Sequence, residues 1–127
     1  MLNLENLRNK NVGILGLGIT GLSVVRALNK AGALLTCWDD DKEKRTDLEL
    51  DGVTVKDLNN KNLLRELDLL VVSPGIPHLY PKPNAIVSLA YELNIKVDND
   101  IGLFFSSHIN DEYEIFSKPP KIIAITG

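Results

Sequence analysis

Three glycines near the start of the chain have the spacing of a ligand-binding loop. They are Gly16, Gly18 and Gly21, in the order Gly-x-Gly-x-x-Gly. In such a loop the first glycine permits a tight turn, the second lets a ligand approach the backbone, and the third lets the following helix pack closely. The free amides and positive dipole end of that helix favour an anionic or hydrogen-bond-accepting group. The spacing therefore predicts binding of such a ligand, in preference to a purely structural turn.

Two later stretches could complete the same site. Asp39 ends an apolar segment, close to where dinucleotide-binding folds place a carboxylate for a ribose hydroxyl. Residues 73–77, with the sequence Ser-Pro-Gly-Ile-Pro, follow the apolar run 68–72. Pro-Gly is an ordinary turn sequence, but the carboxyl ends of parallel strands are also where open α/β sheets bind ligands. The residues alone support these two interpretations of 73–77 equally.

An alternating series of strands and helices is needed to position these residues. We expect strands at 11–16, 33–38, 52–56, 68–72 and 95–97, and helices at 20–31, 58–67 and 83–94. Residues 40–51 are expected to form a solvated loop or short helix. The alternation predicts right-handed crossovers and an α/β fold, Rossmann-like and doubly wound, with a mostly parallel five-stranded sheet and helices on both faces.

Composition excludes several classes of function. The 127 residues carry a net charge of -3 and no basic block, which argues against a nucleic-acid partner. The single cysteine, Cys37, excludes an internal disulfide and is expected to be a small buried strand residue. His78 and His108 have no partner at metal spacing, so we expect no metal site. No stretch resembles a signal peptide or membrane span, which predicts a cytoplasmic protein without a membrane partner.

The C-terminal residues suggest a second unit. We expect a short helix at 98–107, an acidic linker at 109–120 and a strand at 121–127 that leads into a glycine turn. A buried type of strand at the very end suggests a larger protein cut short. The predicted division is thus a Rossmann-like domain at 1–97, with 98–127 as the connecting helix, linker and first strand of a truncated domain.

The chain resembles the N-terminal part of Mur ligases of peptidoglycan synthesis, most closely the branch that adds D-glutamate. The motifs that carry the resemblance are GLGITGLS at 16–23, LVVSPGIP at 70–77, DIGLF at 100–104 and IIAITG at 122–127. The resemblance implies that 1–97 binds the uridine diphosphate (UDP) of UDP-N-acetylmuramoyl-L-alanine, and no dinucleotide. It also implies that 98–127 leads into an ATP-binding domain, with Thr126 and Gly127 at the start of its P-loop.

The resemblance also assigns roles to single residues. Beside Gly18, Ile19 and Thr20 match positions that contact the uracil through backbone and hydroxyl, and Asp39 matches a carboxylate on the uracil side. The turn formed by Ser73, Pro74 and Gly75 matches one whose backbone amides approach the diphosphate. This favours the ligand-binding interpretation of residues 73–77.

Two positions depart from the family pattern. Asp41 stands where relatives place an arginine near the uracil, which leaves Lys42 and Arg45 as candidates to replace it. Gly102 stands where a glutamate usually precedes Leu-Phe. The second departure weakens the local match without affecting the ligand site.

The resemblance implies an ATP- and Mg²⁺-dependent ligase that joins D-glutamate to UDP-N-acetylmuramoyl-L-alanine. The catalytic groups of that reaction are not in this sequence, so we expect the chain to bind UDP as a monomer, bind no cofactor and be inactive. An alternative is an NAD(P)-binding domain of an oxidoreductase, whose fingerprint the glycines and Asp39 satisfy. A second alternative is a non-catalytic nucleotide sensor that ends at Gly127.

Overall fold

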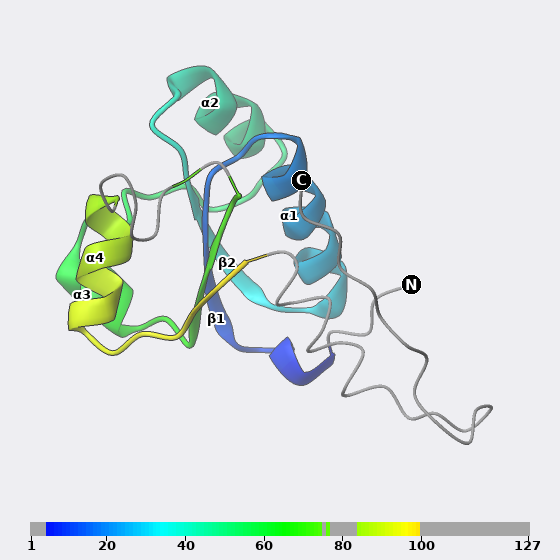
Figure 1. Ribbon diagram of the computed structural model, residues 1–127. Coiled ribbons are helices and arrows are strands. Elements are labelled where there is room, and N and C mark those ends of the chain that lie inside the picture. The colour runs from blue at the N-terminus through cyan, green and yellow to red at the C-terminus, as the bar shows by residue number, and fades with distance from the viewer. Residues whose placement is uncertain (1–4, 75, 77–83, 100–127) are drawn as a thin grey trace, which may run out of the picture.

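A parallel sheet of four strands lies at the centre of the residues described by the computed structural model, which are 5–74, 76 and 84–99 (Figure 1). The strands are β1 (Asn11–Leu15), β2 (Leu34–Trp38), β3 (Leu69–Val72) and β4 (Val97–Asp98). Their spatial order is β2-β1-β3-β4, and each neighbouring pair is parallel. The helices are η1 (Glu5–Leu7), α1 (Ile19–Ala31), α2 (Lys42–Leu50), α3 (Lys61–Arg65) and α4 (Ala85–Glu92). The predicted Rossmann-like α/β fold is therefore confirmed.

The described residues form four of the five predicted strands, which leaves the count of five unconfirmed, because the segment 52–56 does not form a strand. This segment reaches β2 through a single parallel bridge between Val55 and Cys37. Two hydrogen bonds hold it, one from the Cys37 amide to the Thr54 carbonyl (3.0 Å) and one from the Lys56 amide to the Cys37 carbonyl (3.1 Å). Gly52, with a φ of 82°, turns the chain just before it. The segment thus touches the sheet edge at the predicted place but pairs too briefly to form a strand.

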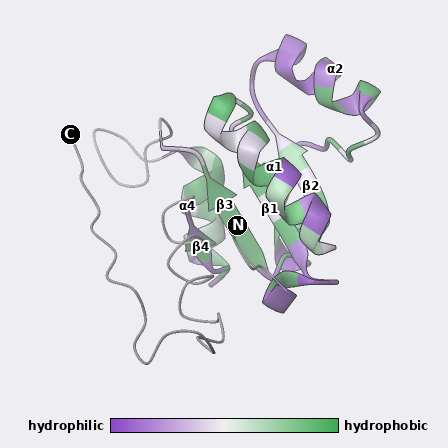
Figure 2. Cartoon of the chain, turned by 90° about the vertical axis from the view of Figure 1, so that its right-hand side faces the viewer, coloured by the Kyte–Doolittle hydropathy of each residue, from purple (hydrophilic) through white to green (hydrophobic). Residues whose placement is uncertain are grey.

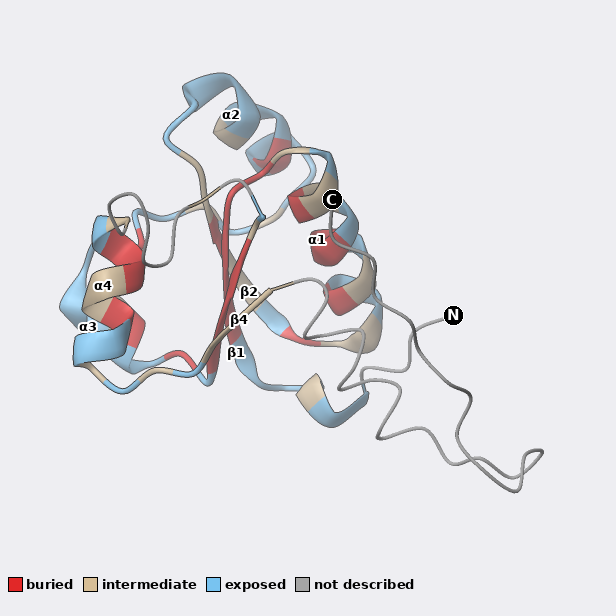
Figure 3. Cartoon of the chain, in the orientation of Figure 1, coloured by how far each residue is buried: buried red, intermediate tan, exposed pale blue. Residues whose placement is uncertain are grey.

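Helices cover both faces of the sheet, as predicted (Figure 3). Successive residues of a strand point to opposite faces of the sheet. Val12 and Ile14 of β1 enter one core cluster, and Leu70 and Val72 of β3 enter the other. Val24, Val25 and Leu28 of α1, with Leu48 of α2, pack on the first face. Leu64 of α3, with Ile86, Val87 and Ala90 of α4, pack on the second.

Local capping sets the helix boundaries. Gly32 ends α1 in the left-handed conformation (φ 89°), as its place after the apolar stripe predicts. The helix predicted at 58–67 is shorter, because the Asn60 side chain caps α3 by accepting from the Leu63 amide at 3.1 Å. Leu58 and Leu67 flank α3 and are still buried. The helix predicted from 83 begins at Ala85, since Asn84 caps it.

Residues 42–50, predicted as solvated loop or short helix, form α2. The helix is largely hydrophilic, in contrast to the apolar strands β1 and β3 (Figure 2). The predicted helix at 98–107, linker and strand at 121–127 lie almost entirely outside the described residues, as do His78, His108 and Gly102. In the part of the chain that the structure describes, no helix is long and apolar enough to cross a membrane.

Candidate functional site

The carboxyl end of β1 is the point where the strand order reverses. β1 pairs with β2 on one side and with β3 on the other, so the connections that leave it run to opposite sides of the sheet. Two hydrogen bonds join the carboxyl ends of β1, β2 and β3. The Gly16 amide donates to the Trp38 carbonyl (2.9 Å), and the Ser73 amide donates to the Leu15 carbonyl (3.0 Å). Open α/β sheets bind ligands in the crevice outside such a switch point.

The three glycines have distinct structural roles. Gly16 has a φ of 96°, which favours glycine, and a Cβ there would also lie 2.8 Å from the Ser73 Oγ. A Cβ on Gly21 would collide with the Gly16 carbonyl oxygen, so helix α1 can pack on the turn only through glycine. A Cβ on Gly18 would meet no described atom within 4 Å. Gly16 and Gly21 thus build the turn, while Gly18 leaves open space beside it.

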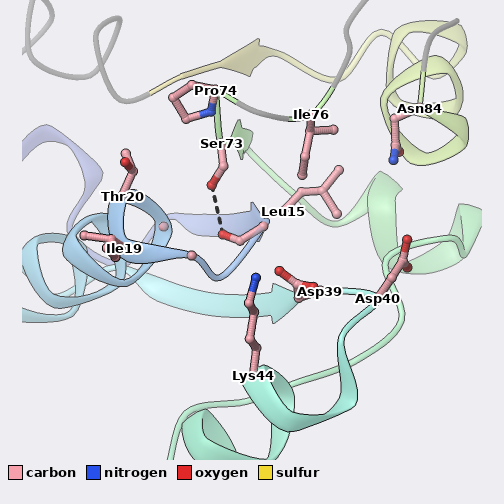
Figure 4. A pocket seen from close by; sticks show the side chains of 13 residues that line it. Leu15, Ile19, Thr20, Asp39, Asp40, Lys44, Ser73, Pro74, Ile76 and Asn84 are labelled. Carbon is pink, nitrogen blue, oxygen red and sulfur yellow. Dashed lines mark hydrogen bonds between the residues drawn. The ribbon is translucent and has the colours of Figure 1, made fainter.

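A cavity of about 450 Å³ lies over this turn (Figure 4). Its volume falls within the range of small-molecule sites. The predicted site residues that line it are Gly18, Ile19, Thr20, Asp39, Ser73 and Pro74. Three other predicted site residues, Gly75, Thr126 and Gly127, lie outside the described residues. The structure therefore brings together six residues from three separate stretches of the chain.

Five further lining residues were not predicted from the sequence. They are Leu15, Asp40, Lys44, Ile76 and Asn84. Leu15 and Asp40 are neighbours of predicted residues, and Ile76 belongs to the turn at 73–77. Lys44 on α2 and Asn84 at the start of α4 had no such signal. They reach the cavity only because these two helices begin at its rim (Figure 4).

The start of α1 offers the cavity hydrogen-bond donors that no described residue uses. Gly18, the N-cap residue, supplies no side-chain cap, and no described residue accepts from the amides of Ile19 and Thr20. The Ile19 side chain is 90% exposed although it is apolar. Free amides at the positive end of a helix of this length favour an anionic group. An exposed apolar side chain beside them can contact a ligand's uncharged part.

The turn after β3 is tied to the glycine turn. The Ser73 hydroxyl donates to the Gly16 carbonyl oxygen at 3.0 Å, as the dashed line in Figure 4 shows. The Ser73 amide is already used by the Leu15 carbonyl, and Pro74 has no amide hydrogen. Neither Ser73 nor Pro74 therefore offers an amide donor to a ligand, and Gly75, the third residue expected to do so, lies outside the described residues.

Asp39 braces the glycine turn as well as lining the cavity. Its carboxylate oxygens accept from the Leu17 amide (2.8 Å) and from the Asp41 amide (2.8 Å). Asp41 in turn caps α2 by accepting from the Glu43 amide at 2.9 Å. Asp41 does not line the cavity, and neither does Lys42. The carboxylate predicted to meet a ligand therefore also holds two backbone segments in place.

Cys37 lies in β2, two residues before Asp39, and is fully buried, as predicted from its strand position. Burial raises the pKa of its thiol from 9.0 to about 12. The thiol therefore stays protonated at neutral pH and is chemically inert there. Among the residues that the structure describes, no group of three His, Cys, Asp or Glu side chains could hold a metal ion.

Comparison with known proteins extends this description. Residues 10–97 match the family described as Mur ligase MurD-like, N-terminal domain. The whole chain is 44% identical to the UDP-N-acetylmuramoylalanine--D-glutamate ligases of Ruegeria pomeroyi and Roseobacter denitrificans. Each alignment covers 100% of this chain and 27% of the relative, so the chain spans about a quarter of the length of these proteins.

A solved structure supports the fold. Shikimate dehydrogenase from Aquifex aeolicus superposes with a TM-score of 0.60 at 18% identity, over 76% of this chain and 44% of that one. At this level of identity the likeness bears on architecture alone. Function therefore has to be argued from the site.

Proposed function

Because the chain belongs to the MurD-like N-terminal domain family of Mur ligases, we propose that its cavity binds the UDP moiety of UDP-N-acetylmuramoyl-L-alanine. The observation that carries the proposal is the cavity at the end of β1, where the glycine turn, Asp39 and the turn at Ser73 meet. Its size suits part of a nucleotide sugar, and its position is the one where α/β sheets bind ligands.

The proposed ligand has two parts that suit different ends of the cavity. A diphosphate is anionic and accepts hydrogen bonds, so it matches the free amides of Ile19 and Thr20 at the start of α1. The uracil and ribose would then lie toward Asp39, at the end of β2. The exposed Ile19 side chain and Thr20 belong to the α1 end of the cavity. The family resemblance assigned both residues to the uracil, and binding studies with separate ligand parts distinguish the two orientations.

We also propose the activity of a full-length ligase that contains this domain. Such a protein would join D-glutamate to UDP-N-acetylmuramoyl-L-alanine, as the names of the relatives state for them. ATP and Mg²⁺ would supply the phosphoryl-transfer chemistry when bound, and Thr126 and Gly127 are proposed to begin the ATP-binding loop. The described residues would serve to hold the nucleotide end of the substrate. We further propose that the protein works in the cytoplasm as a monomer.

Isothermal titration calorimetry of the 127-residue chain tests the proposed ligand. UDP-N-acetylmuramoyl-L-alanine and UDP are expected to give saturable heats, and NADH at the same concentrations none. Binding of NADH at micromolar concentration, with no response to either uridine nucleotide, would instead indicate a dinucleotide-binding domain. D-glutamate alone serves as a control and is expected to give no heat.

A further inference from the structure

The first turn of α2 places two neighbouring cations in different environments. The Arg45 guanidinium lies 4.3 Å from the centre of the Trp38 ring and donates to the carbonyl oxygens of Asp39 (2.8 Å) and Asp40 (3.0 Å). These contacts use its charge and its donors within the protein. Arg45 therefore anchors α2 to the end of β2, and it does not line the cavity.

Lys44, one residue earlier, extends into the cavity instead (Figure 4). No salt bridge joins its ammonium group to a carboxylate of the described residues. The nearby Asp39 carboxylate is held by two backbone amides, and the Asp40 carboxylate accepts from the Trp38 indole at 3.3 Å. The ammonium group thus lies in the cavity without an ion pair among the described residues, on the side where Figure 4 shows the Asp39 carboxylate, so a bound phosphate would share it with that carboxylate.

The backbone around Lys44 is anchored by its neighbours, while its side chain is exposed. Asp41 caps α2 at one end of this turn, and Arg45 clamps the same turn to Trp38 and the Asp39 carbonyl. A lysine on a helix anchored in this way loses less freedom on binding a ligand than one on a loop. Across the cavity lies the start of α1, whose free amides also favour negative charge.

We propose that Lys44 pairs with the phosphate groups of a nucleoside diphosphate held in this cavity, opposite the start of α1. The inference rests on the proposed function and adds a cationic binding residue to it. It also excludes Lys42 and Arg45 from this role, because neither lines the cavity and Arg45 is used internally. Lys44 binds the ligand and takes no part in proton or group transfer.

Calorimetric titration of Lys44→Gln and Lys44→Arg with UDP and with uridine tests this role. Lys42→Gln is the matched control, since Lys42 is exposed on the same turn but outside the cavity. Lys44→Gln is expected to weaken UDP binding about three- to tenfold. This loss lies between the usual contribution of an exposed ion pair and that of a charge-assisted hydrogen bond. Lys44→Arg is expected to bind UDP within about twofold of wild type, because arginine keeps the positive charge. Lys42→Gln is expected to do the same, because Lys42 lies outside the cavity. The affinity of every variant for uridine should also stay within about twofold, because uridine has no phosphate.

The outcomes separate this inference from the function on which it rests. Equal UDP affinity in Lys44→Gln and Lys42→Gln would overturn the role of Lys44 while leaving UDP binding in place. An equal loss for uridine and UDP would also overturn it, since uridine carries no phosphate. Failure of the wild-type chain to bind UDP would overturn the proposed function itself. Thermal unfolding of each variant verifies that the comparison is made between folded proteins.

Discussion

The hydroxyl of Ser73 donates a 3.0 Å hydrogen bond to the carbonyl oxygen of Gly16, which joins the end of β3 to the first residue of the glycine turn. The two residues are far apart in the sequence and adjacent at the switch point of the sheet. The cavity therefore depends on a contact between two turns, and each turn is held by the other.

Removing this hydroxyl should loosen the site. We expect Ser73→Ala to lower the free energy of unfolding by about 1 kcal/mol, the usual net value of one hydrogen bond, and to weaken UDP binding. Urea unfolding and calorimetry provide the two measurements. Ser88→Ala on α4 is a suitable control, because Ser88 is also partly buried but lies outside the cavity. Unchanged stability and affinity in Ser73→Ala would show that the contact is dispensable.

The second and third glycines should respond differently to an added methyl group. Gly21→Ala is expected to destabilise the fold by roughly 1–3 kcal/mol or more, because its Cβ would collide with backbone at Gly16. Gly18→Ala should leave the fold nearly unchanged, since its Cβ would point into open space, yet it should weaken UDP binding. Thermal melting and calorimetry separate the two effects. A Gly18→Ala variant that binds UDP normally would contradict close approach of the ligand at this residue.

The Thr20 hydroxyl offers a test of a single ligand contact. Thr20 lines the cavity, and its hydroxyl has no hydrogen-bond partner among the described residues. If it hydrogen-bonds the bound nucleotide, Thr20→Val should weaken UDP binding by about 0.5–1.5 kcal/mol, up to roughly tenfold. Thr46→Val on the exposed face of α2 is the control. An unchanged affinity would leave Thr20 as a structural residue at the helix start.

The buried thiol of Cys37 should make stability depend on alkaline pH. Its pKa is 9.0 without burial and about 12 in the fold, so between these values the unfolded chain loses a proton that the folded chain keeps. Stability from this group is therefore fully present below pH 9.0 and is lost as pH rises toward 12. The slope should be roughly 1.4 kcal/mol per pH unit in that window.

Cys37→Ala isolates this effect from the lysines and tyrosines that titrate in the same range. The variant should have lower stability at neutral pH, because the substitution leaves a space in the core. Its urea midpoint should fall less steeply than that of the wild type above pH 9.0. Parallel curves for the two proteins would mean that the thiol ionises in the folded state as readily as in the unfolded one.

The parts of the fold that the sequence predicted depend on local signals. The apolar run before Gly16 and the apolar stripe of α1 predicted β1 and its helix, and Gly32 predicted where α1 ends. The segment at 52–56 has comparable strand-forming residues, but its pairing depends on how much of the β2 edge it can reach. That is a tertiary property, so a strand was predicted where a single bridge forms.

The candidate site was predictable where its residues end a strand or begin α1. Lys44 could not be found in this way, because it reaches the cavity only through the cap at Asp41 and the stacking of Arg45 on Trp38. Asn84 was overlooked because Pro83 before it is an equally good start signal for a helix. Its side chain caps α4 by accepting from the Ile86 amide at 2.8 Å, and so stands at the cavity rim.

The most direct test of the central claim is a titration of the ¹⁵N-labelled chain followed by its amide resonances. With UDP-N-acetylmuramoyl-L-alanine, we predict saturable shifts concentrated at the start of α1, Asp39, the first turn of α2 around Lys44 and the turn at Ser73, and no shift of these resonances with NADH. Saturable shifts with micromolar NADH, and none with the uridine nucleotide, would contradict the proposal that this cavity binds UDP.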